Sequence, residues 1–280
     1  MKVFLSADIE GCCGVAFIHD MMPGKSWFPY FQKQLGREVS AACEGALAAG
    51  AEKILVRDSH YLGCNIIPTD LPEDERIFLS RGVPHDPYVM MGGIQDDKYD
   101  AAIFVASHSG RHSRDTNVAH TFTDALEVFT INGVNMSEFT LSALMASYNN
   151  VPVVFLSGDK GACDEAEDVM PGITTVSTFE LQGGRAVVAQ HPNIVVRKIR
   201  EKVQEALEGD FSKLIVPLPE EFDMRMRFHA HAQAFNMSYY PGAERLDNFT
   251  VRLCSKDFMD ILRFIHFAVI PLRGGEFDQD

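Results

Sequence analysis

The sequence has few basic residues and no cluster of them. Its 280 residues include 25 Lys and Arg against 39 Asp and Glu, which gives a formal net charge of −14. Proteins that bind nucleic acid or anionic membranes gather Lys and Arg against phosphate groups, so we expect neither partner. No apolar run approaches the roughly 18 residues that a membrane-spanning helix needs. The apolar stretch before Asp8 is also too short for the core of a signal peptide, so we expect a soluble cytoplasmic protein.

CxxC pairs are also absent, although the chain holds six cysteines. A chain of this length can bury a full core without disulfides, and its hydrophobic fraction of 46% is ordinary for a globular protein. We therefore expect reduced thiols, as in the cytoplasm. Cys12 and Cys13 lie beside an acidic motif, but adjacent residues do not easily ligate one tetrahedral ion, so packing roles are expected for both.

The pattern of apolar residues predicts a parallel α/β core with flanking helices. Short apolar runs predict strands at 3–7, 53–57, 76–80, 101–107, 152–157 and 172–178. Helical spacing and capping residues predict helices at 30–49, 86–96, 137–148, 163–169 and 192–208. Strands that alternate with helices in this way are expected to run parallel and to be joined by right-handed crossovers.

The last quarter of the chain has a different pattern. Residues 222–234 alternate apolar and polar side chains, which predicts a half-exposed antiparallel strand. A partner strand is predicted at 248–254, a helix at 256–270 and a loose tail at 273–280.

These patterns divide the chain into two parts. We expect a metal-binding α/β catalytic domain at 1–215 and a smaller α+β portion at 216–280. Within the first part, the Asn132-Gly133 pair predicts a tight hairpin turn in residues 126–136.

Side chains that bind metals follow three of the predicted strands. The first strand ends in Asp8-Ile9-Glu10, the second in Asp58-Ser59-His60 and the third in His108. Ligands bind at the carboxyl ends of parallel strands, and residues two apart in an extended chain point the same way. Buried carboxylates need a counter-charge, which a divalent cation supplies. The candidate ligands are therefore Asp8, Glu10, His60 and His108, and zinc suits them best, with manganese or cobalt as alternatives.

Two other features have a plain structural interpretation. His229 and His231 lie on one face of a predicted strand, where the alternating pattern favours a solvated surface over a metal site. The segment GDKGA at 158–162 lacks the spacing of a phosphate-binding P-loop and is interpreted as a strand-to-helix turn.

Several segments together resemble the bacterial zinc D-aminopeptidases of the dipeptide-transport operon type. They are MKVFLSADIEG, ILVRDSH, FVASH, INGVNMSE and VPVVFLSGDKGACDEAEDVMP, and the resemblance is densest over residues 1–171. The resemblance implies a metallo-aminopeptidase with two zinc ions per subunit that hydrolyses short peptides with N-terminal D-amino acids such as D-Ala. It also implies a homo-oligomer, assembled as a decameric ring.

The resemblance also implies residue roles. Asp8 would bridge the two zinc ions, with Glu10 and His60 completing one site and His108 and Glu138 the other. His120 would be a catalytic histidine, and His112 in the same loop is a competing candidate. Without the resemblance, Glu138 would be interpreted as a favourable charge at a helix N-terminus. The segment after Gly11, CCGVAFIHD, departs from the family's pattern and is expected to border the substrate.

Two alternative functions stay open at this point. The same metal centre could serve a phosphoesterase or another amidase, or the carboxylates could hold a structural cation in a non-catalytic, peptide-binding oligomer. Structural zinc sites are usually closed and rich in sulfur, so an Asp/Glu/His set favours catalysis.

Overall fold

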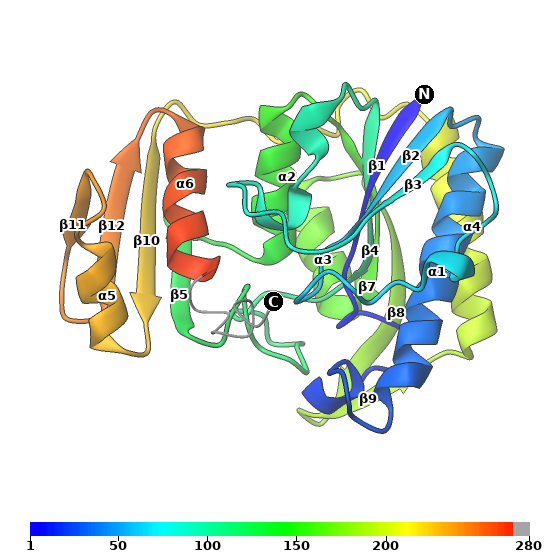
Figure 1. Cartoon of the computed structure of the whole chain (residues 1–280), viewed down its shortest axis with the longest axis horizontal. Helices are drawn as coiled ribbons and strands as arrows, with labels where there is room; N and C mark the ends of the chain where they lie inside the picture. The colour runs from blue at the N-terminus through cyan, green and yellow to red at the C-terminus, as the bar shows by residue number, and fades with distance from the viewer. Residues whose placement is uncertain (271–280) are drawn as a thin grey trace.

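A computed structural model describes residues 1–270 of the chain and contains two sheets (Figure 1). The larger sheet has seven strands in the order β3-β2-β1-β4-β7-β8-β9. Their bounds are Ile77–Ser80 (β3), Lys53–Asp58 (β2), Lys2–Ala7 (β1), Ala101–Ser107 (β4), Val153–Asp159 (β7), Thr174–Gln182 (β8) and Ala186–Ala189 (β9). Neighbouring strands pair in parallel except β9, which runs antiparallel to β8. The predicted parallel α/β core is confirmed.

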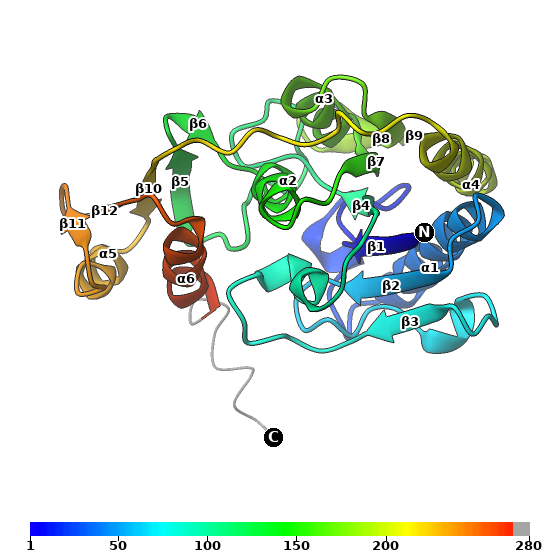
Figure 2. The same ribbon diagram turned by 90° about the horizontal axis from the view of Figure 1, so that it is seen from above.

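Helices cover both faces of this sheet (Figure 2). The helices α1 (Phe28–Ala48) and α4 (Pro192–Glu208) pack together on one face, while α2 (Glu138–Tyr148) and α3 (Lys160–Val169) lie on the other. The predicted cap of α2 is present, because the Ser137 hydroxyl accepts a hydrogen bond from the Thr140 N–H at 3.0 Å. A buried strand with helices on both sides explains why β4 and β7 read as continuous apolar runs rather than alternating ones.

The smaller sheet is antiparallel and has the order β11-β12-β10-β5-β6. Its strands are Ala243–Arg245 (β11), Thr250–Ser255 (β12), Phe222–Phe228 (β10), Leu126–Ile131 (β5) and Val134–Asn135 (β6). Helices α5 (His231–Met237) and α6 (Phe258–Val269) lie along one face of it (Figure 2). Alternate residues of β10 are buried, as the half-exposed pattern predicts.

The small sheet takes its strands from two distant parts of the chain. The β5–β6 hairpin, with Asn132 and Gly133 both at positive φ, forms as predicted but pairs with β10 through contacts such as Phe129 with Met226. The hairpin thus belongs to the second sheet, although it precedes residue 215 in the sequence. The division into 1–215 and 216–280 stays a prediction, and the expected tail at 273–280 lies outside the described residues.

Two predicted elements are wrong in part. The helix expected at 86–96 is replaced by the short 3-10 turns η3 (Val89–Met91) and η4 (Ile94–Asp96), because Gly92 and Gly93 interrupt it and Gly93 has a φ of 104°. The strand expected at 222–234 ends at Phe228, opposite the first residues of its antiparallel partners β5 and β12, and α5 follows from His231.

The strand order creates a crevice next to β1. The chain proceeds from β1 to β2 on one side and later places β4 on the other, so the order reverses between β1 and β4. Ligands of open α/β sheets bind at such a switch point, outside the carboxyl ends of the strands. No helix in residues 1–270 has the length and apolar character needed to cross a bilayer, and all six cysteines are free thiols.

Candidate metal centre

The acidic segment after β1 is fixed against β4. The Asp8 N–H donates to the Val105 carbonyl at 2.9 Å, and the Gly11 N–H donates to the Ala106 carbonyl at 2.8 Å. A Cβ on Gly11 would lie 2.0 Å from the Ser107 carbonyl oxygen, so the close approach requires glycine. Between these anchors, the carboxylates of Asp8 and Glu10 are buried, with 5% and 3% exposure.

His60 is held by the loop that follows β2. The buried carboxylate of Asp58 accepts hydrogen bonds from the N–H groups of Asn65 and Ile66 at 2.6 and 2.7 Å. The Asn65 side chain in turn donates to the His60 carbonyl at 2.7 Å. Asp58 therefore positions His60 through the backbone rather than through its ring. The Nδ1 atom of His60 lies 2.9 Å from Glu10 Oε2 and 3.3 Å from Asp8 Oδ1.

His108 follows an irregularity at the end of β4. The register of β4 against β7 shifts between Phe104 and Ser107, and Ala106 has a φ of 58°. The Nδ1 atom of His108 lies 2.9 Å from the Ser109 carbonyl, which can only accept, so Nδ1 carries the proton. The free Nε2 atom then faces Glu138 Oε1 at 3.4 Å and Asp8 Oδ2 at 3.9 Å.

Glu138 enters the cluster from the first position of α2. Its Oε1 atom accepts a hydrogen bond from the Phe122 N–H at 2.6 Å. Phe122 has a φ of 61°, an uncommon conformation for a residue with a side chain. Residue patterns alone miss this ligand candidate. The available signal was the Ser137 cap, which places the next residue at the helix N-terminus but does not reveal what it faces.

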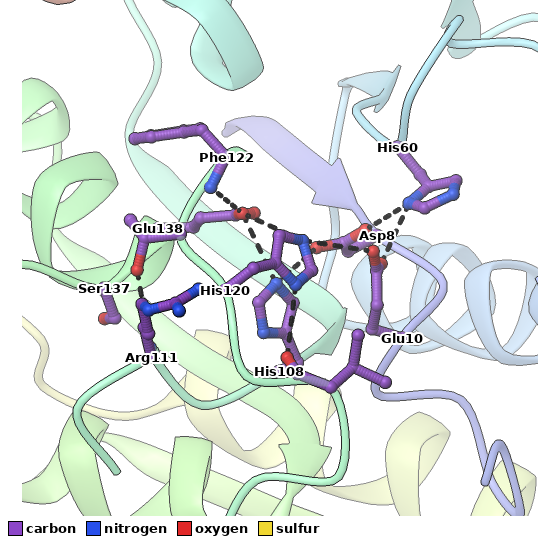
Figure 3. A network of polar contacts seen from close by, with 12 residues as sticks. Asp8, Glu10, His60, His108, Arg111, His120, Phe122, Ser137 and Glu138 are labelled. Carbon is purple, nitrogen blue, oxygen red and sulfur yellow. Dashed lines mark hydrogen bonds and ion pairs between the residues drawn. The ribbon is translucent and has the colours of Figure 1, made fainter. Parts of the chain in front are cut away.

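His120 joins the cluster (Figure 3), whereas His112 does not. The Nδ1 atom of His120 lies 3.1 Å from the Val118 carbonyl, and its Nε2 atom lies 3.6 Å from Glu10 Oε1 and 3.7 Å from Glu138 Oε1. Its ring stacks on that of His108 with centroids 4.4 Å apart. His112 is instead 3.6 Å from Glu165 and lines a different cavity.

The carboxylates and imidazoles of this cluster shift one another's pKa values. Burial and the adjacent Glu10 raise the pKa of Asp8 well above its usual range. Burial opposes the ionisation of Glu10 and Glu138, but His60 lowers the pKa of Glu10 and His108 lowers that of Glu138, to about 2. Three carboxylates this close therefore need positive charge, which a bound divalent cation supplies.

The donor atoms form three sets in which each residue's ligand atom lies within 4.8 Å of the others. The sets are Asp8/Glu10/His60, Asp8/His108/Glu138 and Glu10/His108/His120. The Nε2 atom of His108, which faces Asp8 and Glu138, is buried without a hydrogen-bond partner within residues 1–270, as expected of a nitrogen that binds a metal ion. Carboxylate oxygen and imidazole nitrogen are a donor set that suits zinc. These residues therefore fit a metal centre.

The two other candidate histidines lie elsewhere. The Nε2 atom of His229 lies 3.1 Å from the guanidinium of Arg111, and His231 is the first residue of α5. The sets of possible metal ligands found in the described part of the chain include neither residue. The surface interpretation of His229 and His231 stands, although they do not share a strand.

Comparison with known proteins gives one consistent result. The sequence model of the family Peptidase M55, described as D-aminopeptidase, matches residues 1–267. A D-aminopeptidase from Bacillus subtilis (strain 168) is 29% identical over 262 residues, which are 93% of each protein. A solved structure, described as a Zn-dependent D-aminopeptidase DppA from Bacillus subtilis and a self-compartmentalizing protease, superposes with a TM-score of 0.89. It is 26% identical in sequence, and the match covers 99% of this chain and 100% of that one.

Proposed function

Because this chain belongs to the D-aminopeptidase family Peptidase M55, we propose that it removes N-terminal D-residues from short peptides with two zinc ions held at the cluster after β1. In this proposal Asp8 would be a ligand of both ions. Glu10 and His60 would complete one site, and His108 and Glu138 would complete the other.

The two-metal assignment is supported by the two ligand sets that share Asp8, which together supply five different residues. Glu10 and His108 also belong to two sets each, and the resemblance to the family selects Asp8 as the shared ligand. The two oxygens of Asp8 face different sets. Its Oδ1 atom faces His60 at 3.3 Å, and its Oδ2 atom faces His108 at 3.9 Å. A carboxylate whose two oxygens face different ligand sets is suited to bridging. The zinc dependence stated for the structural relative supports zinc as the metal.

The chain's own residues have distinct tasks in peptide hydrolysis. Bound zinc supplies Lewis acidity toward a water molecule and the scissile carbonyl. The Val118 carbonyl accepts a hydrogen bond from the Nδ1–H group of His120, so the Nε2 atom of His120 presents a lone pair toward the centre. His120 is thus placed to accept a proton from the attacking water and to return it to the leaving amine. His112, which pairs with Glu165, has no such position.

The family favours an aminopeptidase over the alternatives considered from the sequence, which were a phosphoesterase, another amidase and a non-catalytic peptide-binding protein. We test it with zinc-loaded protein on D-Ala-D-Ala, L-Ala-L-Ala and p-nitrophenyl phosphate. Release of D-alanine at a rate well above that of the other two products is expected. Turnover of the phosphate ester alone, or of no substrate, would refute the proposal.

The metal assignment is tested by substitution. Asp8→Asn should lower bound zinc from two ions per chain and abolish hydrolysis, because it weakens both sites at once. Asp168→Asn is a matched control, since Asp168 is an exposed residue of α3 outside all three ligand sets. An Asp8→Asn variant that retains both ions and full activity would contradict the assignment.

We also propose that the chain assembles as a homo-oligomer, with the decameric ring as the specific expectation. The structural relative is described as self-compartmentalizing. Several large apolar side chains are well exposed on the single chain, among them Trp27 at 61% and Tyr239 at 74%. Light scattering after size exclusion should give a mass near ten chains, and a monomer would contradict the proposal. A cytoplasmic location stays a prediction.

A further inference from the structure

A cavity of about 200 Å³ opens directly beside the metal centre. Its wall includes Asp8, Glu10, His60, His120 and Glu138. The largest part of the remaining wall is apolar and consists of Ile18, Met21, Met22, Tyr61, Met90 and Phe122. The lining residues, taken from residues 1–270, include no Lys or Arg. The cavity therefore combines polar groups of the metal centre with six apolar or aromatic residues.

The apolar wall is held in place by polar contacts behind it. The Asp20 carboxylate accepts hydrogen bonds from the N–H groups of Ala16 and Phe17 at 3.0 and 3.1 Å, which fixes the 3-10 turn η1 (Ile18–Asp20). The Met90 carbonyl accepts a hydrogen bond from the Ser59 hydroxyl at 3.1 Å. Because the wall is formed without a ligand, little ordering is needed when a substrate enters.

Two residues of the wall adopt a backbone conformation that is uncommon for residues with side chains. Tyr61, which follows His60, has a φ of 49°, and Phe122, whose N–H binds Glu138, has a φ of 61°. Such conformations persist where surrounding contacts enforce them, often at ligand sites. Here the same two segments supply a polar contact or a ligand candidate to the metal centre and a lining residue to the cavity.

We propose that this wall is the subsite for the side chain of the peptide's N-terminal D-residue, and that it selects a bulky apolar one. The inference rests on the proposed aminopeptidase function. The N-terminal residue carries both the free amine and the scissile carbonyl, so its side chain is the one nearest the metal centre. The methyl group of D-alanine would bury little apolar surface against this six-residue wall. The larger side chain of D-leucine or D-phenylalanine would bury much more apolar surface there and would bind more tightly.

The charged residues that line the cavity also favour an apolar side chain on the substrate. Asp124, which is exposed, is the one carboxylate among the lining residues that is not a proposed zinc ligand. It would repel an acidic side chain, and the lining residues include no Lys or Arg that could pair with one. The carboxylates of Asp8, Glu10 and Glu138 add no repulsion, because the bound zinc ions would offset their charge. The subsite thus favours an uncharged, apolar side chain.

The first test compares kcat/KM of the zinc-loaded enzyme on D-Ala-Gly-Gly, D-Leu-Gly-Gly and D-Glu-Gly-Gly. Each further buried carbon is worth roughly a factor of four, so D-Leu should exceed D-Ala by about 10- to 60-fold. D-Glu should be the poorest of the three. Turnover of D-Ala-Gly-Gly with no preference for D-Leu would refute the subsite and leave the aminopeptidase function standing. Failure to cleave any peptide would refute both.

The second test changes the wall. Ile18→Ser and Met22→Ser should each lower the D-Leu to D-Ala ratio of kcat/KM by about 3- to 10-fold. Partial unfolding of a variant lowers kcat/KM for both peptides by the same factor. The D-Leu to D-Ala ratio therefore does not change when a substitution only destabilises the enzyme. Ile194→Ser in α4 is the matched control, because Ile194 is 39% exposed, similar to Ile18 at 47%, and lies outside the cavity. An unchanged ratio in both wall variants, or an equal change in the control, would overturn the inference.

Discussion

Replacing His120 by alanine should slow hydrolysis strongly while leaving zinc bound. The Nε2 atom of His120 lies 3.6 Å from Glu10 and 3.7 Å from Glu138, within the cluster but outside the two ligand sets that share Asp8. Glu138 keeps its hydrogen bond from the Phe122 N–H after the substitution. The proposed ligands of both zinc ions therefore remain in place, and what disappears is a group able to accept and return a proton.

The expected loss follows from the usual contribution of a positioned acid or base. Such a group accelerates a reaction by about 10²- to 10⁴-fold, which corresponds to roughly 3 to 5 kcal/mol of the activation free energy. Because proton transfer occurs in the chemical step, the loss should be found mainly in kcat rather than in KM. His120→Gln should be similarly slow, since the amide keeps some hydrogen bonding but cannot carry the proton.

The assay is release of D-alanine from D-Ala-D-Ala under saturating zinc, with the zinc content measured on the same samples. His112→Ala is the matched control, because His112 comes from the same loop yet lies beside Glu165 in another cavity. Its kcat should stay within about threefold of the unaltered enzyme. Near-normal turnover of His120→Ala, or a large loss in His112→Ala, would refute the assignment of the proton-transfer role.

Two further predictions concern buried carboxylates behind the site: Glu38 of α1, which accepts a hydrogen bond from the Cys13 N–H at 3.0 Å, and Asp159 at the end of β7. Burial raises the pKa of Glu38 to about 7 from its ordinary 4.5, so the folded chain retains a proton that the unfolded chain loses between these pH values. Stability should therefore fall by roughly 3 kcal/mol as pH rises through this window, and urea unfolding of Glu38→Gln should lack this component; identical pH profiles would contradict it. Asp159 accepts from the N–H of Ser109, whose carbonyl binds His108. Asp159→Asn should weaken zinc binding about tenfold in a chelator competition, and an unchanged affinity would show that this support is dispensable.

Much of the fold follows from local patterns. The centres of β1, β2, β4 and β7 are short apolar runs, and the intervening helices have caps or apolar stripes, so the parallel core is predictable. The strand ends then bring together Asp8, Glu10, His60 and His108 because β2, β1 and β4 are neighbours. The spacing of residues along the sequence suggests that these three strands are neighbours, but only the structure shows that they are.

The remaining features depend on contacts between distant segments. The alternation in β10 predicts a half-exposed strand, but not that the strand pairs with the hairpin at Leu126–Ile131 on one side. Glu138 and His120 follow no period, since one begins a helix and the other lies in an irregular loop. They meet through the Phe122 N–H and the Val118 carbonyl, which no sequence pattern encodes. The resemblance to a family, rather than periodicity, brought these two residues into the predicted site.

Anomalous diffraction at the zinc edge, recorded from crystals of the zinc-loaded protein, would locate the metal ions themselves. Two peaks per chain are expected, one between Glu10 and His60 and one between His108 and Glu138, with Asp8 contacting both. A single peak, or peaks that do not share Asp8, would contradict a two-zinc centre built on that carboxylate.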